Sequence, residues 1–135
     1  MGFPDTKLLL SRLNAWTLVL LSVLVAPIAN AESLRVLSQN MDRLFDNIDD
    51  GNNAQLLPGN RFRQRVKTAA KKFGDEFSLP HIIALQEVEN LNVLQQIAIE
   101  IRDRYQAEYR LILMPAQDDS GINLAYLVRF GVEIK

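Results

Sequence analysis

Two short segments of the chain lead into polar side chains that commonly bind metals or phosphates. The apolar run 82–85 leads into Gln86 and Glu87, and segment 34–39 leads into Asn40 and Asp42. Buried strands of α/β enzymes often deliver a carboxylate near their C-terminal end. Two such ends at one edge of a sheet would suit a divalent cation such as Mg²⁺, which prefers oxygen ligands and keeps several waters for a phosphate-bearing substrate. The sequence therefore predicts a cation site where these segments meet.

The elements that would position these residues follow an α/β order. We expect strands at 34–39, 82–86, 109–114 and 122–129, with a further strand beginning at 132–134. A helix is expected between the first two strands, with Asn60 as its N-cap and Gly74 as its stop. Its apolar face has helical spacing and comprises Phe62, Val66, Ala69, Ala70 and Phe73.

A second amphipathic helix is expected after Glu87. Its apolar face would comprise Leu91, Leu94, Ile97, Ala98, Ile101 and Tyr105. The stretch 46–60 is rich in Asp, Asn, Gly and Pro and reads as a loop. It lacks the Glu twelve residues after a first Asp that an EF-hand requires, so we expect a solvated loop rather than a calcium site.

The first helix carries a basic face opposite its apolar one. The cations are Arg61, Arg63, Arg65, Lys67, Lys71 and Lys72. They could steer phosphates. The alternative is that they form only the solvated side of an amphipathic helix, which is the more common case.

The first 31 residues have the order of a secretory signal. Lys7 and Arg12 precede an apolar run of 12 residues at 15–26, and Pro27 and the small residues 29–31 follow it. The run is shorter than the ~20 residues that a membrane span needs. We therefore expect cleavage after Ala31, a secreted or periplasmic product, a mature domain at 32–135, and no stable membrane insertion.

The charge of the mature segment gives no general attraction for nucleic acid. Removing Lys7, Arg12 and Asp5 from 15 basic and 16 acidic residues leaves 13 and 15. A nucleic-acid enzyme of this charge would depend on a local patch and on a metal. Cysteine is absent, so the domain cannot rely on disulfides.

Taken together, segments 38–40, 82–90 and 121–129 resemble the N-terminal half of the endonuclease/exonuclease/phosphatase superfamily, the DNase-I-like metal-dependent phosphoesterases. The resemblance implies that Glu87 is a metal-binding carboxylate. It implies that Asn40 orients the phosphate and the metal-bound water, and it assigns Asp42 less firmly as a further metal-facing group. The implied cofactor is Mg²⁺, with Mn²⁺ or Ca²⁺ as alternatives. The implied substrate is nucleic acid or another phosphodiester.

The chain also departs from the superfamily pattern. Asn123 stands where an Asp is usual, and the neighbouring Asp118 and Asp119 are not expected to be ligands. The superfamily's catalytic His, Asp-x-Asn and terminal Asp-His segments have no counterpart here. His81, at the start of an expected strand, lies opposite the end from which Glu87 emerges, so it is not expected to be a general base.

The resemblance implies half of a four-layer α/β sandwich, with a mixed or antiparallel sheet and two helices. We expect a truncated domain whose apolar sheet face stays exposed for aggregation or for a missing C-terminal half. The expected function is that of an exported metal-dependent phosphodiester hydrolase, foremost an endonuclease, inactive on its own. Two alternatives remain. One is a non-catalytic exported module that binds an anionic partner through its basic helix, and the other is a lipid- or sugar-phosphate phosphatase fragment.

Overall fold

Residues 33–51, 55–117 and 120–133, which the computed structural model describes, contain a four-stranded mixed sheet and two α-helices. The strands are β1 (Val36–Leu44), β2 (Ile82–Val88), β3 (Tyr109–Met114) and β4 (Asn123–Arg129), in the spatial order β1-β2-β4-β3. β1 runs parallel to β2, whereas β4 is antiparallel to both β2 and β3. The α/β prediction is confirmed at this level, as an α+β fold.

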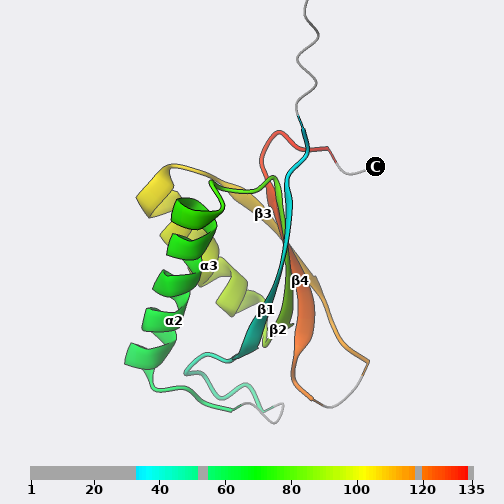
Figure 1. The fold of residues 1–135 in the computed structure, drawn as a ribbon. Coiled ribbons are helices and arrows are strands. Elements are labelled where there is room, and N and C mark those ends of the chain that lie inside the picture. Colours follow the sequence, from blue (N-terminus) through cyan, green and yellow to red (C-terminus); the bar gives the residue numbers. More distant parts are fainter. Residues whose placement is uncertain (1–32, 52–54, 118–119, 134–135) are drawn as a thin grey trace, which may run out of the picture. The chain divides into compact units, whose positions relative to one another are not determined.

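Both helices, α2 (Gly59–Lys71) and α3 (Leu91–Tyr105), cover the same face of the sheet (Figure 1). α2 lies in the crossover between β1 and β2, which parallel strands require. All five apolar residues predicted for this helix are buried. The core fills the layer between sheet and helices, and its largest fully buried side chains include Phe73, Leu44, Ile83, Leu85, Leu94, Ile97, Ile101 and Leu127.

The ends of the first helix differ from the prediction. Pro58 holds the N-cap position, because Asn60 already lies inside the helix, where its side chain accepts from the Arg61 amide. Gly74 does not stop the helix, which continues as a π-helical turn, η2 (Lys72–Glu76). The physical reason is packing: a Cβ on Gly74 would overlap the ring of Tyr105, so glycine here serves a close contact with α3.

The second helix matches its prediction over most of its apolar face. Leu94, Ile97 and Ile101 are buried, whereas Leu91 at the first position is 45 % exposed. Asn90 caps the helix, because its Oδ1 accepts from the Val93 amide at 3.0 Å. Such a cap satisfies one of the amides that a helix start leaves unpaired.

β1 is longer than predicted and lies at an edge of the sheet. The strand continues beyond Asn40 to Leu44, and its register with β2 shifts between these two residues. Asn40 therefore lies within the strand, just before a bulge, and Glu87 lies within β2, one residue before that strand ends. The strands extend further because Leu44 and Val88 pair again after the bulge.

The strand expected at 132–134 is not formed at Val132 and Glu133. Gly131 adopts a positive φ of 90°, and the Val132 amide donates to the Arg129 carbonyl, so the chain turns here. Ile134 and the expected leader 1–31 lie outside the described residues. No helix in the described ranges is long and apolar enough to cross a membrane.

Neither helix covers the other face of the sheet (Figure 1), which carries apolar side chains on all four strands beside the polar Ser38, Asn40 and Gln86. We call it the open face; its exposed or half-buried apolar side chains are Val36, Ile82, Ala84, Ile112, Met114, Leu124 and Tyr126. Register joins them across strands, with Tyr126 opposite both Ala84 and Ile112. Among the described residues, no element packs on this face.

Candidate functional site

Asn40 and Glu87, which the sequence predicts to converge, are hydrogen-bonded to each other. The Asn40 Nδ2 donates to Glu87 Oε1 at 2.7 Å, across 47 residues of chain. The second carboxylate oxygen, Oε2, accepts from the Arg43 amide at 3.1 Å. The carboxylate is thus held between two donors from the end of β1, and both of its oxygens keep lone pairs for further partners.

The backbone around this pair adopts unusual conformations. Asp42, Arg43 and Glu87 have positive φ values of 50°, 52° and 60°. For non-glycine residues, such conformations cost on the order of 1–3 kcal/mol each and persist where the surroundings impose them. The bulge turns the Asp42 amide toward Asn40 Oδ1, at 2.7 Å. Both ends of the Asn40 amide are therefore oriented before any ligand binds.

Asp42 lies at the same bulge, but its side chain is exposed and forms no hydrogen bond with Glu87. Its amide donates to Asn40 Oδ1, and its carbonyl accepts from Arg65. Among residues 33–51, 55–117 and 120–133, no three His, Cys, Asp or Glu side chains gather in a way that could hold a metal. Asp118 and Asp119 lie outside the described residues.

The donor set fits a hard cation that keeps most of its water. Mg²⁺ is usually held by one or two carboxylates, with waters and substrate phosphates completing its octahedron. Glu87 provides one half-buried carboxylate with free lone pairs, and Asn40 turns its Nδ2 toward this carboxylate and its Oδ1 toward the Asp42 amide. This set suits Mg²⁺ or Mn²⁺ better than Ca²⁺, which takes six to eight oxygen ligands.

Two buried carboxylates behind the site were not predicted. Asp46, expected in a solvated loop, is only 1 % exposed, so that expectation is wrong for this residue. Its carboxylate accepts from the Ile48 amide and from the side chains of Asn90 and Asn92. Its amide donates to Glu89 Oε2 at 2.7 Å. This part of the loop therefore folds back onto the end of β2 and the start of α3, which no sequence signal predicted.

Glu89 is the second buried carboxylate. It is 6 % exposed, and among the described residues its Oε1 has no hydrogen-bond partner. Burial raises the pKa of Glu89 above its ordinary value, the Asp46 amide lowers it, and the Asp46 and Asp50 carboxylates raise it further. The neutral form of this side chain is therefore favoured relative to an exposed Glu.

Asn123 and His81 have structural contacts that explain their positions. The Asn123 side chain donates to the Glu89 carbonyl and accepts from the Ala116 amide. An Asp could not make the first of these bonds when ionised. His81 Nδ1 accepts from the Arg35 amide at 3.0 Å, just before β2 begins. Six residue steps along the strand, or about 20 Å, separate it from Glu87.

The basic face of α2 is divided between two roles. Arg61, Arg63, Lys67 and Lys71 are exposed, as a solvated face predicts. Arg65 and Lys72 are half-buried and turn toward β1. The Lys72 Nζ donates to Gln39 Oε1 at 2.8 Å, and Arg65 donates to backbone carbonyls of the bulge. Neither cation is therefore merely part of the solvated surface.

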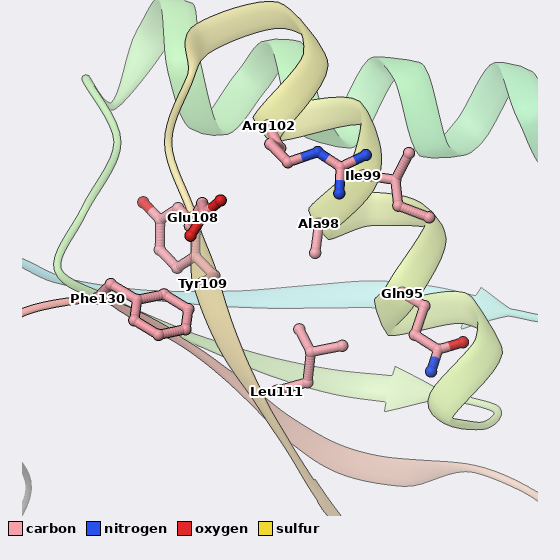
Figure 2. Close-up of a pocket in the computed structure, with 8 residues that line it drawn as sticks. All are labelled: Gln95, Ala98, Ile99, Arg102, Glu108, Tyr109, Leu111 and Phe130. Carbon is pink, nitrogen blue, oxygen red and sulfur yellow. The ribbon is translucent and has the colours of Figure 1, made fainter.

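Two hollows flank the sheet. One, of about 280 Å³, lies between β1 and α2 and includes Asn40, Asp42, Arg65 and Lys72 in its lining. The other, of about 250 Å³, lies between α3 and β3, where Arg102 and Ile99 face Tyr109, Leu111 and Phe130 (Figure 2). Asn40 lines the first of these two hollows, and Glu87 lines neither.

Comparison with protein-family models, with curated proteins and with solved structures finds no match for this chain. The resemblance described above therefore stays a prediction, and the geometry of the site is the basis for assigning a role.

Proposed function

We propose that this chain carries the metal-binding and phosphate-orienting part of a metal-dependent phosphodiester hydrolase of the endonuclease/exonuclease/phosphatase superfamily, with an endonuclease as the first candidate. The observation that carries the proposal is the contact between Asn40 Nδ2 and Glu87 Oε1, at 2.7 Å, near the ends of two parallel strands. The superfamily resemblance assigned these residues to one site.

The roles of the two side chains follow from their chemistry. Glu87, which accepts hydrogen bonds from the Asn40 side chain and the Arg43 amide, would bind the cation through the remaining lone pairs of its carboxylate. A bound divalent cation supplies positive charge that polarises a phosphoryl oxygen and stabilises the leaving group. Asn40 uses one N–H for Glu87 and keeps a second to donate to a phosphate oxygen.

The proposal includes a second sheet on the open face, as in a four-layer sandwich. Asn40 shares this face with Ser38 and Gln86, whose side chains are hydrogen-bonded to each other, because alternate strand residues point the same way. A layer packed there would border the site and could bring the histidine and Asp-x-Asn groups of the superfamily. His81, the only histidine of the chain, is too far from Glu87 to act as the base.

Metal titration of the full chain tests the proposal directly. Isothermal calorimetry with Mg²⁺ and Mn²⁺ should detect binding that Glu87→Gln weakens by more than about tenfold, since even outer-shell changes cost about 10- to 100-fold. Glu108→Gln is the matched control, because Glu108 is exposed and precedes β3. Equal binding by both variants would remove Glu87 from the site.

Cleavage assays test the need for the second layer. With Mg²⁺, the chain alone should leave DNA and RNA uncut, whereas robust cleavage would show that the described residues suffice. Phospholipid and sugar-phosphate substrates belong in the same assay, because the Asn40–Glu87 pair would contact the phosphate group and not the rest of the substrate.

The exposed cations of α2 favour a second candidate, a non-catalytic module that binds an anionic partner. Arg61, Arg63, Lys67 and Lys71 remain exposed, and the first turn of the helix contains no acidic residue. This candidate predicts binding to nucleic acid that falls with salt and that Arg63→Gln with Lys67→Gln weakens. Absence of binding at low salt would eliminate it. Export stays a prediction for either candidate.

A further inference from the structure

The guanidinium group of Arg65 donates hydrogen bonds to three successive backbone carbonyls at the end of β1. Arg65 Nη2 donates to the Met41 carbonyl at 2.5 Å and to the Asp42 carbonyl at 2.8 Å. Arg65 Nη1 donates to the Arg43 carbonyl at 3.3 Å. Carbonyls of an ordinary strand point alternately to its two sides, so their convergence on one group depends on the bulge.

The same bulge presents the amides that orient the site. Asp42 and Arg43, both at positive φ, donate their N–H groups to Asn40 Oδ1 and Glu87 Oε2. The carbonyls and the amides of these residues belong to one short piece of backbone. Fixing the carbonyls on Arg65 therefore fixes where the amides point.

Arg65 itself is firmly anchored. It belongs to α2, whose neighbouring residues Phe62, Val66 and Ala69 are buried in the core. A second link from this helix, Lys72 to Gln39, reaches the strand just before Asn40, and Gln39 in turn donates to the Asn40 carbonyl at 2.6 Å. The bulge is thus held from the helix on both sides of Asn40.

The geometry points to Arg65 as a positioning residue: by clamping the carbonyls of residues 41–43, it fixes the Asn40 amide and the Glu87 carboxylate in their mutual orientation. A guanidinium suits this task because its planar fork carries five donors in fixed directions. Lysine would keep the charge but offers a single nitrogen, which cannot span three carbonyls in the same way.

The orientation can be tested without any metal. In nitrogen–proton NMR spectra of the full chain, Arg65→Lys and Arg65→Met should shift the Arg43 amide and the Asn40 side-chain NH₂ signals and speed exchange of the Arg43 amide by at least about tenfold. Amides of Leu94 and Ile97 in the core should stay unchanged. Arg63→Lys and Arg63→Met are matched controls, because Arg63 is exposed on the same helix.

Rescue separates positioning from general packing. Arg65→Ala should regain the wild-type Arg43 and Asn40 signals when guanidinium ion is added, and ammonium ion should not replace it. Unchanged Arg43 and Asn40 signals in both the Lys and the Met variants would overturn the inference. So would equal shifts in the Arg63 controls.

The effect on metal affinity rests on the proposed function, and the two can fail separately. If the wild type binds Mn²⁺, Arg65→Lys should bind it about 10- to 100-fold more weakly, as expected for an outer-shell residue. If the wild type binds Mn²⁺ and Arg65→Lys binds it equally tightly, the inference about Arg65 is overturned and the proposed function stands. No binding by the wild type would remove the proposed function, while the NMR signals still decide the role of Arg65.

Discussion

Several side chains in this domain are fixed because most of their polar groups form hydrogen bonds. Asn40 is the clearest case, since it donates to a carboxylate and accepts from a backbone amide two residues away. Tyr109 is another, because its buried hydroxyl donates to the Pro80 carbonyl at 2.7 Å. Losing one member of such a pair leaves the other unsatisfied, which costs more than the bond contributed.

Tyr109→Phe should therefore destabilise the domain at neutral pH by about 1–2 kcal/mol, because the Pro80 carbonyl loses its partner. Denaturant unfolding with the same readout for both proteins measures this difference. Tyr126→Phe is the matched control, because it removes a half-buried hydroxyl on the open face without affecting Pro80. Equal losses in the two variants would contradict the assignment.

The same tyrosine predicts an alkaline pH dependence. Burial raises the pKa of Tyr109 above its ordinary value of 10.0, against the lowering effect of Arg129 and Arg35. The folded state thus keeps the proton longer than the unfolded state, so the stabilisation is complete below pH 10 and is lost as the pH rises through the folded pKa. Melting temperatures above pH 10 should fall less steeply in Tyr109→Phe than in the wild type. Some fall remains, because the pKa of Tyr105 is also raised.

At the scale of elements, the helices and strands were predictable and their irregular ends were not. The apolar spacing of Phe62, Val66 and Phe73 predicts α2, because a helix buries one stripe. The bulge after Asn40 was missed, since it depends on Arg65 and Glu87, which are remote in sequence. Likewise, the convergence of Asn40 and Glu87 was predictable because each follows an expected strand, whereas the burial of Asp46 depends on tertiary contacts.

The π-helical turn gives a prediction of its own. Gly74→Ala should destabilise the domain by about 1–3 kcal/mol, because the added methyl group overlaps the Tyr105 ring and forces a shift. Thermal or denaturant unfolding measures the loss. In a double-mutant cycle, most of it should vanish when Tyr105 is replaced by Ala, which removes the ring. Additive losses would mean that Gly74 matters for its backbone alone.

Within residues 33–51, 55–117 and 120–133, one face of the sheet is covered by the two helices and the other is not. Val36, Met114 and Leu124 on the open face are 60 %, 47 % and 48 % exposed. Contiguous apolar surface of this kind is rare on soluble monomers and favours association. β1 and β3 are also the edge strands of the described sheet, so each has one side that no other described strand pairs.

We expect the isolated chain to self-associate through the open face. Replacing Ile112 and Leu124 by Thr should shift the distribution in sedimentation velocity toward monomer, because Thr keeps strand propensity and removes apolar area. Ile48→Thr is the control, since Ile48 is 52 % exposed but lies outside the sheet. A distribution unaffected by the double substitution would place association elsewhere.

The parallel pairing of β1 with β2 has a consequence for the order in which the domain assembles. β3 and β4 follow each other along the chain, whereas β1 reaches β2 only after α2 has closed a long crossover. Contacts between distant segments form late, because the entropy of closing a long loop is lost before the contact contributes its favourable energy. The Asn40–Glu87 contact should thus be among the last to appear during refolding. As β1 is an edge strand, the same contact should be among the first to open.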